Sequence, residues 1–432
     1  MIHGSLLIIL DRFRWVYCQL DTLRRCMPSS IRRALNELPI TLDDTYERML
    51  QGIPKEKFEH ASRLFQCMVA AIRPLRVEEL AELFAIEFGS NDAPNLVESW
   101  RPENAKEAVL STCSTFIAIV DDDNKGNKND DDSDDKGGDE KGSRTVQFSH
   151  FSVKEFLTSD RLQFSEVGNI RQYYIPLEPA HAILARACVA VLMQADEEQD
   201  EKRFRALPLG SYAIDYWVRH ARFGDVASQI EDSLAYLFNP KMPFFKPRIL
   251  VVYFEDRAQA DFNNFEFYEP DKVTPLFLAA ACGFNGLVKH LIIVHAPDVN
   301  AEGGSRFSPL HVASRNGQVD SARVLLDSGA HVDARNSFGC TSLHEASWFG
   351  HLKLAQLLLE RGADLNARAD FQSTPVRMAS NQGHLETVRF LLDHGADVNL
   401  RAIDGLTPYD VATQNGHHGV AQLLLEHGAE RE

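Results

Sequence analysis

The stretch Ser308-Pro-Leu-His-Val-Ala-Ser314 has four close copies in the last third of the chain. Successive copies begin 34, 33, 33 and 33 residues apart, and a glycine stands nine residues after every start. A second glycine stands 21 residues after each of the last four starts, where the first copy has His295. Because these features recur in phase, the copies are repeats of one structural unit. The other copies are Thr274-Pro-Leu-Phe-Leu-Ala-Ala280, Thr341-Ser-Leu-His-Glu-Ala-Ser347, Thr374-Pro-Val-Arg-Met-Ala-Ser380 and Thr407-Pro-Tyr-Asp-Val-Ala-Thr413; the glycines are Gly283, Gly317, Gly350, Gly383 and Gly416, then Gly329, Gly362, Gly395 and Gly428.

Each feature of the repeat suits a pair of short helices. Thr or Ser caps a helix N-terminus, and Pro fits the first helical position. Small Ala residues allow close packing, and the first glycine ends the first helix where a positive φ is useful. A second helix follows, as at residues 355–361, and the second glycine ends it. Residues 363–368 then lead into a polar hairpin towards the next repeat.

The pattern resembles the ankyrin repeat from Thr274 to about Glu430, which gives five repeats. The resemblance implies a stack of helix pairs, an α-solenoid, with a concave surface that binds other proteins. Nothing in the repeat supplies a nucleophile, a metal site or a phosphate-binding loop, so we expect no catalytic, cofactor-binding or metal-binding residues. We assign His311 and His344 to the repeat's own hydrogen bonding at the helix start.

The resemblance also transfers the positions through which ankyrin repeats contact partners. These are the hairpin tip and the two residues before the first glycine. Four aromatic rings among them, on one predicted face, favour a hot spot for protein binding. The alternative is that the rings pack against adjacent hairpins or against the N-terminal half. The candidate partner-binding residues are Arg315, Asn316, Phe338, Trp348, Phe349, Phe371, Asn381 and Gln382.

Ahead of the repeats, the sequence predicts helices followed by a two-stranded hairpin. Apolar residues at helical spacing mark the stretches 42–50 and 61–72, and a third helix begins at Val77. A short helix at 105–113 precedes the apolar run 116–120. Residues 145–148 offer a matching strand. This order of elements favours a winged-helix domain.

An acidic segment, residues 121–143, separates the two predicted strands. It holds ten Asp or Glu residues and four Lys residues among Gly, Asn and Ser. This composition cannot form a packed core, so we predict a disordered acidic insert at the tip of the wing. A wing that touches DNA needs positive charge, and the helix with Glu103, Lys106 and Glu107 is not basic either. The pattern therefore disfavours DNA binding.

A second resemblance covers about residues 11–223. This stretch is similar to the part of fungal NACHT-type STAND proteins that follows their nucleotide-binding module. It includes a winged-helix domain named after GPI inositol-deacylase and a helical connector behind it. The stretches that carry the resemblance are 13–26, 35–48, 73–82, 148–157 and 209–222.

The two resemblances together imply a domain order. A remnant of the post-NACHT helical segment would occupy 1–27, and the winged-helix domain 28–160. A helical connector would occupy 161–240, and a linker or divergent N-terminal cap 241–273. The five ankyrin repeats would occupy 274–432.

Two enzyme motifs are absent from the sequence. It contains no Gly-x-x-x-x-Gly-Lys-Ser/Thr loop, and ten residues precede Asp11, so we expect no binding of ATP or GTP. It contains no Gly-x-Ser-x-Gly elbow, so the family name does not imply deacylase activity. His150 and Ser152 stand close together, and we expect His150 to be a buried structural residue that leads into a helix. The chain is either a natural short form or an incomplete gene model.

The composition predicts a soluble protein of the cytoplasm. The 62 acidic and 45 basic residues give a net charge of −17, which repels nucleic-acid phosphates. No apolar run approaches the roughly 20 residues of a membrane helix, and the start of the chain does not read as a signal peptide. The seven cysteines show no CxxC spacing, so we expect free thiols in the core.

These observations predict a mainly α protein, in which a winged-helix and helical platform precedes an ankyrin-repeat α-solenoid. They favour a non-enzymatic scaffold or adapter that binds a protein partner on the concave ankyrin face, in a fungal NLR-like signalling or non-self recognition pathway. One alternative is the C-terminal regulatory or sensor part of a NACHT-type STAND NTPase. Another is a winged-helix DNA-binding regulator. The partner, the signal and the oligomeric state stay open.

Overall fold

The computed structural model describes residues 41–88, 94–121, 144–194, 205, 207–240 and 273–430. These residues form two compact units. The first takes the described residues up to 191 and from 205 to 226, and the second takes 192–194 and those from 227 onward. Helices dominate both units, which confirms the mainly α fold. The predicted segment 1–27, the predicted linker or cap 241–273 except Val273, and the insert beyond residue 121 lie outside the described residues.

The first unit combines helices with a small sheet. Helix α4 is amphipathic as predicted, with Leu64, Phe65 and Val69 buried. Its elements in chain order are α3 (Leu42–Gln51), η2 (Lys55–Lys57), α4 (Phe58–Ala70), β1 (Leu75–Arg76), α5 (Val77–Glu82), η3 (Leu83–Ala85), β2 (Ile86–Glu87), β3 (Asn95–Leu96), η4 (Glu98–Trp100), α6 (Ala105–Cys113), β4 (Ile117–Asp121), β5 (Arg144–Phe148), α7 (Phe151–Leu157), α8 (Asp160–Gln163), α9 (Gly168–Arg171), α10 (Leu177–Leu192) and α12 (Gly210–Ala221).

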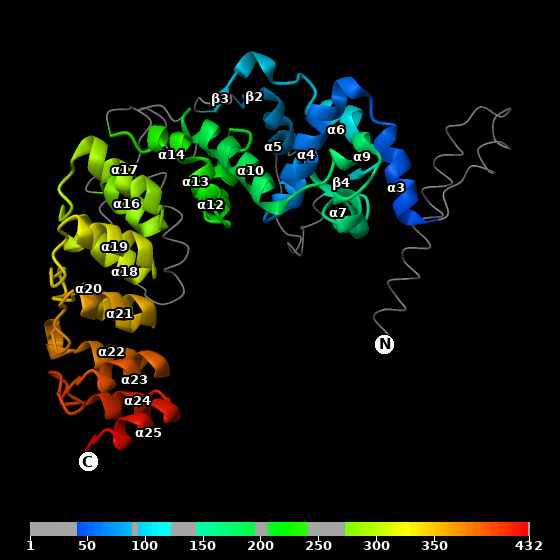
Figure 1. The fold of residues 1–432 in the computed structure, drawn as a ribbon. Coiled ribbons are helices and arrows are strands. Elements are labelled where there is room, and N and C mark those ends of the chain that lie inside the picture. Colours follow the sequence, from blue (N-terminus) through cyan, green and yellow to red (C-terminus); the bar gives the residue numbers. More distant parts are fainter. Residues whose placement is uncertain are drawn as a thin grey trace, which may run out of the picture. The chain divides into compact units, whose positions relative to one another are not determined.

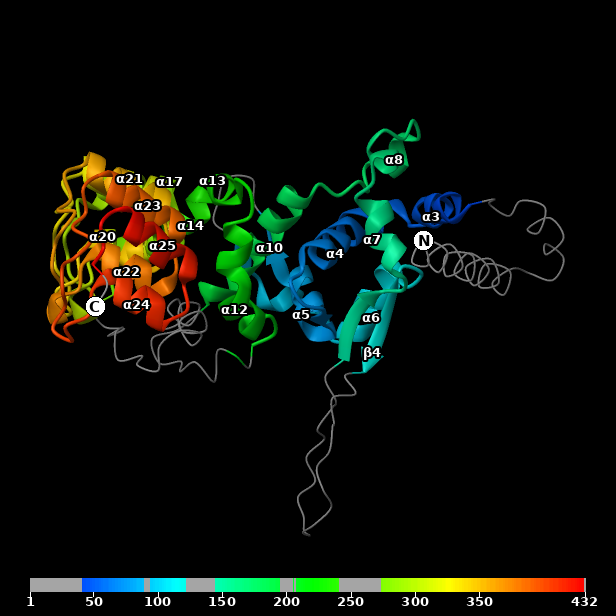
Figure 2. The ribbon, with the colours of Figure 1, turned by 90° about the horizontal axis from the view of Figure 1, so that it is seen from below.

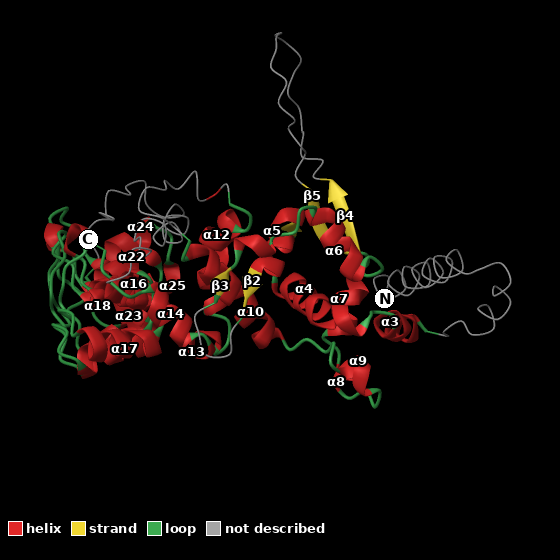
Figure 3. Ribbon diagram, turned by 90° about the horizontal axis from the view of Figure 1, so that it is seen from above, coloured by secondary structure: helices red, strands yellow, loops and turns green. Residues whose placement is uncertain are grey.

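The main sheet has the antiparallel strand order β1-β5-β4, in which β4 and β5 form the predicted hairpin (Figure 3). Val146 of β5 is buried and pairs with Leu75 on one side and Ile119 on the other. The predicted start of the acidic insert is wrong by one residue. Asp121 still belongs to β4, because it pairs with Arg144 across the hairpin.

Aromatic rings form the core of the first unit. The Phe65 ring lies 5.3 Å from that of Phe116, and the Tyr46 ring lies 5.4 Å from that of Phe156. These rings join α3, α4 and α7 to the residue just before β4. Such ring pairs add about 0.5–1.5 kcal/mol beyond the burial of their apolar area.

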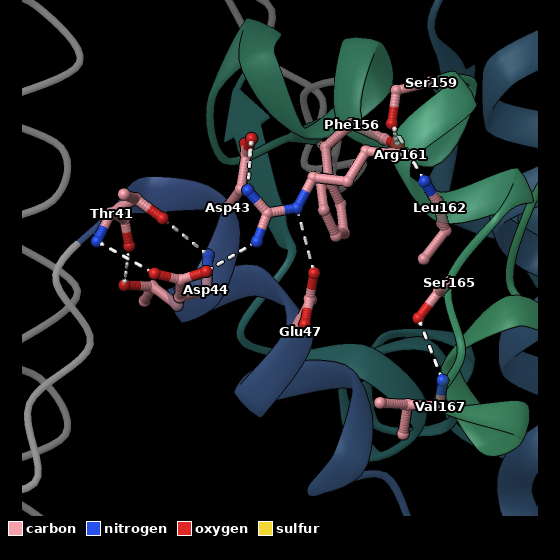
Figure 4. Close-up of polar contacts among 11 residues, drawn as sticks. Thr41, Asp43, Asp44, Glu47, Phe156, Ser159, Arg161, Leu162, Ser165 and Val167 are labelled. Carbon is pink, nitrogen blue, oxygen red and sulfur yellow. Dashed lines mark hydrogen bonds and ion pairs between the residues drawn. The ribbon is translucent and has the colours of Figure 1, made fainter.

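Arg161 of α8 binds the neighbouring helix α3 through three carboxylates (Figure 4). Its Nε lies 3.0 Å from Glu47 Oε1, and its Nη2 lies 2.5 Å from Asp44 Oδ1. Its Nη1 lies 3.4 Å from Asp43 Oδ2. The hydrogen bond from Thr41 and the contact with Arg161 lower the pKa of Asp44. One guanidinium group therefore accommodates several carboxylates, because its donors point in different directions.

Helices α10 and α12 are joined by a histidine pair. His181 Nδ1 and His220 Nδ1 lie 2.8 Å apart, and His220 Nε2 lies 2.8 Å from the Tyr212 hydroxyl. That hydroxyl accepts a hydrogen bond of 3.1 Å from the Ile72 N–H. Burial lowers the pKa of His181 to about 4 and that of His220 to about 3. Both rings are therefore neutral at pH 7.

The second unit contains five helix pairs stacked in chain order, with their hairpins gathered along one edge (Figures 1 and 2). The first helices of the pairs pack against one another, and so do the second helices. Helix α13 (Val226–Gln229) spans the boundary between the units. The elements are α14 (Glu231–Leu237), α16 (Pro275–Cys282), α17 (Asn285–His295), η6 (Gly304–Arg306), α18 (Pro309–Arg315), α19 (Val319–Asp327), α20 (Ser342–Trp348), α21 (Leu352–Glu360), η7 (Asp370–Gln372), α22 (Pro375–Gln382), α23 (Leu385–Asp393), α24 (Pro408–Gln414) and α25 (His418–Glu426).

The local signals of the repeat act as predicted. Thr274 accepts a hydrogen bond from the Phe277 N–H at the start of α16, and Pro275 is the first helical residue. All nine predicted glycines have φ between 70° and 94°. In the first repeat, where the second glycine is missing, Ala296 takes the left-handed conformation with φ 43°.

Candidate partner-binding surface

Six of the eight predicted residues end three consecutive first helices. Helices α18, α20 and α22 pack side by side, so their C-terminal ends form one row. All six side chains are half-buried. A positive-φ glycine follows each pair and ends the helix at the same place in every repeat. The pairs are Arg315 and Asn316 at α18, Trp348 and Phe349 at α20, and Asn381 and Gln382 at α22.

Phe338 and Phe371 stand in the hairpins before α20 and α22. Main-chain hydrogen bonds join these hairpins in sequence. The Asp370 N–H donates to Phe338 O, and the Ile403 N–H donates to Phe371 O, both at 2.9 Å. Phe338 is 38% exposed, Phe371 72% and Ile403 69%. Ile403 adds a third exposed apolar side chain to those of Phe338 and Phe371 in consecutive hairpins. Sequence analysis missed it because Asp404, not Ile403, aligns with the two Phe residues.

The hairpin that carries Phe371 has left-handed backbone at two non-glycine residues, as does the hairpin before α18 at Ser305 and Arg306. Phe371 and Gln372 both have positive φ, 61° and 60°, whereas the hairpin of Phe338 has Gly339 at the second of these places. A non-glycine residue in this conformation costs on the order of 1 kcal/mol or more. The fold therefore presents the Phe371 ring to solvent at an energetic cost.

A polar cluster that sequence analysis missed joins the helix ends to the hairpins. Glu345 is 7% exposed and lies between two donors, Arg315 Nη1 at 3.5 Å and Asn336 Nδ2 at 3.2 Å. The Arg315 guanidinium carbon lies 4.8 Å from the centre of the Phe349 ring. Burial raises the pKa of Glu345, while Arg315 acts in the opposite direction. The available signal was a charged residue at a place where the other repeats have Leu278, Val312, Met378 and Val411.

Histidines of the last three repeats hold the ends of the preceding first helices. In each case the ring Nε2–H donates to the carbonyl of a predicted surface residue. Each bond thus connects the row of helix ends to the following repeat. The pairs are His351 with Arg315 at 3.0 Å, His384 with Trp348 at 2.9 Å and His417 with Asn381 at 3.1 Å.

His311 and His344 have the predicted role at the helix start. In each ring, Nδ1 accepts from the main-chain N–H of the capping residue and Nε2 donates to a carbonyl of the next repeat. Burial lowers the pKa of each to about 4, so both are neutral at pH 7. The partners are Ser308 (3.2 Å) and Cys340 (3.1 Å) for His311, and Thr341 (3.1 Å) and Ser373 (3.1 Å) for His344.

His150 differs from expectation in its burial. It is half-buried rather than buried, because it stands at the exposed N-terminus of α7 as the capping residue. The Ser152 N–H donates to its Nδ1 at 3.3 Å, and the Ser152 hydroxyl lies 2.6 Å from the same nitrogen. The Tyr46 hydroxyl lies 2.9 Å from Ser152 Oγ. These contacts join the start of α7 to α3.

In the described part of the chain, no three His, Cys, Asp or Glu side chains gather as ligands for a metal ion. None of the described helices has both the length and the apolar composition for crossing a bilayer. The cysteines within the described ranges are buried free thiols, as expected: Cys67, Cys113, Cys188, Cys282 and Cys340.

Comparisons with known proteins identify the repeat. The family model described as ankyrin repeats (3 copies) matches residues 253–336, 276–369 and 343–431. The C-terminal region therefore carries ankyrin repeats, a kind of domain that is typically non-catalytic and binds other proteins.

Similar proteins include a fungal one. Azaphilone pigments biosynthesis cluster protein L of Monascus ruber is 27% identical over 312 residues, which is 69% of this chain and 61% of that relative. Alpha-latrocrustotoxin-Lt1a of Latrodectus tredecimguttatus is 41% identical over 61 residues, 14% of this chain and 4% of the toxin. Neurogenic locus notch homolog protein 1 of Xenopus tropicalis is 46% identical over 67 residues, 16% of this chain and 3% of that protein. The chain thus spans only part of each relative.

Proposed function

Starting from the ankyrin repeats, we propose that this chain is a non-enzymatic scaffold or adapter that binds a protein partner on the concave face of the stack. The observation that carries the proposal is the row of helix ends in repeats two to four. Trp348 and Phe349 stand at its centre, half-buried, and the exposed Phe338 and Phe371 stand in the adjoining hairpins. Aromatic residues, Trp above all, are enriched among the hot spots of protein interfaces.

The composition of this surface favours a protein over a small molecule or a nucleic acid. Asn316, Asn381 and Gln382 supply amide groups that can both donate and accept, which suits a polypeptide main chain. The aromatic rings supply apolar area that a partner can cover. Charge is sparse in the row, since Arg315 is its only ionisable side chain and Glu345 lies beside it.

We propose that the first unit is a winged-helix domain with a helical connector, and that it acts as a regulatory platform. The order α4, β1, α5, α6, β4, β5 and the sheet order β1-β5-β4 support this assignment. Helix α6 carries Lys106 beside Glu107 rather than a run of basic residues. The insert between β4 and β5 is acidic in sequence. These charges favour contacts with protein over contacts with DNA.

We propose a cytoplasmic setting without membrane insertion, in a fungal NLR-like signalling or non-self recognition pathway. The similarity to a Monascus protein over more than half of the chain supports a fungal setting. The resemblance of residues 11–223 to NACHT-type STAND proteins supports the pathway. In that setting the ankyrin stack would recognise the partner and the first unit would pass on the signal.

The test is affinity capture from the cells that express the protein. We expect the double variant Trp348→Ala, Phe349→Ala to lose its partner, with binding weakened by about 30-fold or more, because hot-spot truncations cost about 2 kcal/mol or more. Quantitative mass spectrometry of the captured proteins measures the loss. Circular dichroism and thermal unfolding of the same variant show whether the stack is intact.

The matched control is the pair Ile293→Ala, Val294→Ala. These two residues are also adjacent, apolar and close to a helix end, but they lie exposed on the second helix α17 of the first repeat. Partner capture should survive in the control. Equal capture by wild type and by the Trp348, Phe349 variant would reject the surface assignment.

A further inference from the structure

Arg315 in the row of helix ends and the buried Glu345 beside it stand at places where the other repeats are uncharged. Arg315 occupies the place seven residues after a repeat start, and Glu345 the place four residues after one. They come from consecutive repeats and contact each other at 3.5 Å. The counterparts of Arg315 are Ala281, Trp348, Asn381 and Gln414, and those of Glu345 are Leu278, Val312, Met378 and Val411.

Glu345 is a costly residue for the stack. A buried carboxylate loses its hydration, and an apolar residue in its place is often neutral or stabilising. Four repeats of this chain carry apolar residues there and fold in the same way. The stability of the stack therefore does not account for Glu345, and its neighbours indicate another role.

Glu345 positions two parts of the surface at once. On one side it lies beside the guanidinium of Arg315, whose central carbon lies over the Phe349 ring. On the other side it accepts from Asn336 Nδ2. The Asn336 side-chain oxygen in turn accepts from the Phe338 N–H at 2.9 Å and so shapes the hairpin that carries Phe338. One buried carboxylate thus links the cation to both aromatic positions.

The Arg315 guanidinium has N–H donors that remain available to a ligand. It is 26% exposed, and among the described residues its side chain makes one hydrogen bond, at the long distance of 3.5 Å. A guanidinium group carries five N–H donors in a planar fork that matches a carboxylate. The nearby Glu345 does not prevent a second carboxylate from binding. Arg101 pairs with Glu82 at 2.7 Å and Glu98 at 3.2 Å, and Arg161 pairs with three carboxylates (Figure 4).

We propose that Arg315 binds an Asp or Glu side chain within an extended segment of the partner, and that an apolar neighbour of this residue packs against Trp348 and Phe338. The inference rests on the proposed function and names the chemistry of the partner. The row continues beyond Arg315 with amide side chains at Asn381 and Gln382. A segment bound to Arg315 can therefore extend along the row towards these amides, and the proposal commits to an acidic side chain inside that segment.

The experiment pans a library of random 12-residue peptides, each fused to carrier protein at both ends, against the full chain. We expect the enriched peptides to share an Asp or Glu beside an aromatic or aliphatic residue. Replacing that acid by its amide should weaken binding to the wild type by about tenfold or more, because hydrogen bonds to charged groups are strong. The same replacement should have little effect on binding to the variant Arg315→Gln.

Two further variants serve as controls. Arg361 has nearly the same exposure, 30%, and pairs with Asp327 at 2.8 Å between the same two repeats, but on the second helices. Arg361→Gln should therefore leave peptide binding unchanged. Arg315→Lys keeps the charge without the planar fork, so it should bind more weakly than wild type and more tightly than Arg315→Gln.

Other outcomes would contradict either the acidic anchor at Arg315 or the proposed binding surface. Peptides that require Trp348 and Phe349 but bind equally to Arg315→Gln would overturn the acidic anchor and leave the proposed function standing. Enriched peptides without an acidic residue would do the same. Failure to enrich any peptide that depends on Trp348 and Phe349 would count against both the anchor and the proposed surface.

Discussion

Asp333 stands at a place where the other junctions between repeats have Asn300, Asn366 and Asn399. Its side chain therefore carries an oxygen atom in place of the amide nitrogen, and this changes the contact between repeats. Side chains eight places before a repeat start accept a hydrogen bond from a main-chain N–H 31 residues later. Asn300 and Asn399 also donate, to Gly329 O at 3.3 Å and Gly428 O at 3.2 Å. An ionised carboxylate has no hydrogen to donate, so Asp333 cannot form the second bond.

We therefore expect Asp333→Asn to raise the free energy of unfolding by about 0.5–1.5 kcal/mol, the net worth of a typical hydrogen bond. The reverse change, Asn300→Asp, should lower it by a similar amount. Urea unfolding followed by far-UV circular dichroism measures both. Repeating the measurement in 1 M salt, where the screening length is about 3 Å, removes most of the effect of the altered charge. A gain that vanishes in salt would contradict the hydrogen-bond explanation.

At the scale of the helix, the glycine that ends each first helix has two roles. Gly350 and Gly416 have nearly the same positive φ, 70° and 75°. A Cβ at Gly350 would meet the His384 ring at 2.5 Å, whereas a Cβ at Gly416 would meet no described atom within 4 Å. The first site thus needs both the backbone conformation and the space, and the second needs the conformation alone.

The comparison of Gly350 with Gly416 predicts a difference between the free energies of unfolding of two alanine variants. Gly416→Ala should lower the free energy of unfolding by about 1 kcal/mol, the cost of a left-handed alanine. Gly350→Ala should cost about 1–3 kcal/mol more, because the added methyl group displaces the His384 ring from the Trp348 carbonyl. Chemical denaturation of the two single variants makes the comparison. Equal losses would show that space at Gly350 has no energetic role.

The sequence predicted helices better than short strands. Helix α6 lies at Ala105–Cys113, as predicted, and the capping residues located the five first helices of the repeats. The strands β1, β2 and β3 were not predicted, because two residues cannot show an alternating pattern. Their pairing depends on residues far away in the chain, such as Val146 for Leu75.

The surface was predicted in outline only. The resemblance to ankyrin repeats supplied the partner-contacting positions, and the repeat period placed them at equivalent points of successive repeats. The apolar residues at the same place in the other repeats could have indicated that Glu345 is buried. Its contacts could not be predicted, because they involve Arg315 in the preceding repeat and Asn336 in the preceding hairpin. A charged residue beside alanines in a helix is otherwise typical of an exposed face. The energetic roles of the eight predicted residues stay predictions.

At the scale of the whole molecule, burial lowers the pKa of five described histidines; for four of them, two in each unit, the pKa falls to about 4 or 3, whereas His351 is lowered less. The pKa is about 4 for His181, His311 and His344, and about 3 for His220. An unfolded histidine has a pKa of about 6.5. Below that pH the unfolded chain binds protons that the folded chain does not, so acid favours unfolding.

We expect the free energy of unfolding to fall as the pH decreases from about 6.5 towards 4, by up to about 1.4 kcal/mol per pH unit for each histidine. Glu345 opposes this trend, because burial raises its pKa and the folded state then gains a proton first. Urea midpoints between pH 7.5 and pH 5 test the expectation. A midpoint that stays constant between pH 6.5 and pH 5 would contradict it.

The bonds between repeats also bear on how the length of this stack can change during evolution. Each type joins residues at a fixed separation, 36 for the histidines that reach the preceding helix end and 31 for the Asn and Asp side chains. If the 33 residues 341–373 were lost, His384 would meet the Arg315 carbonyl and the Asp397 N–H would meet Asp333. Gene rearrangements can therefore remove or duplicate a whole repeat and leave both types of bond with a matching partner. Such exchange would alter the proposed binding surface in single steps, without the slow accumulation of compensating point mutations.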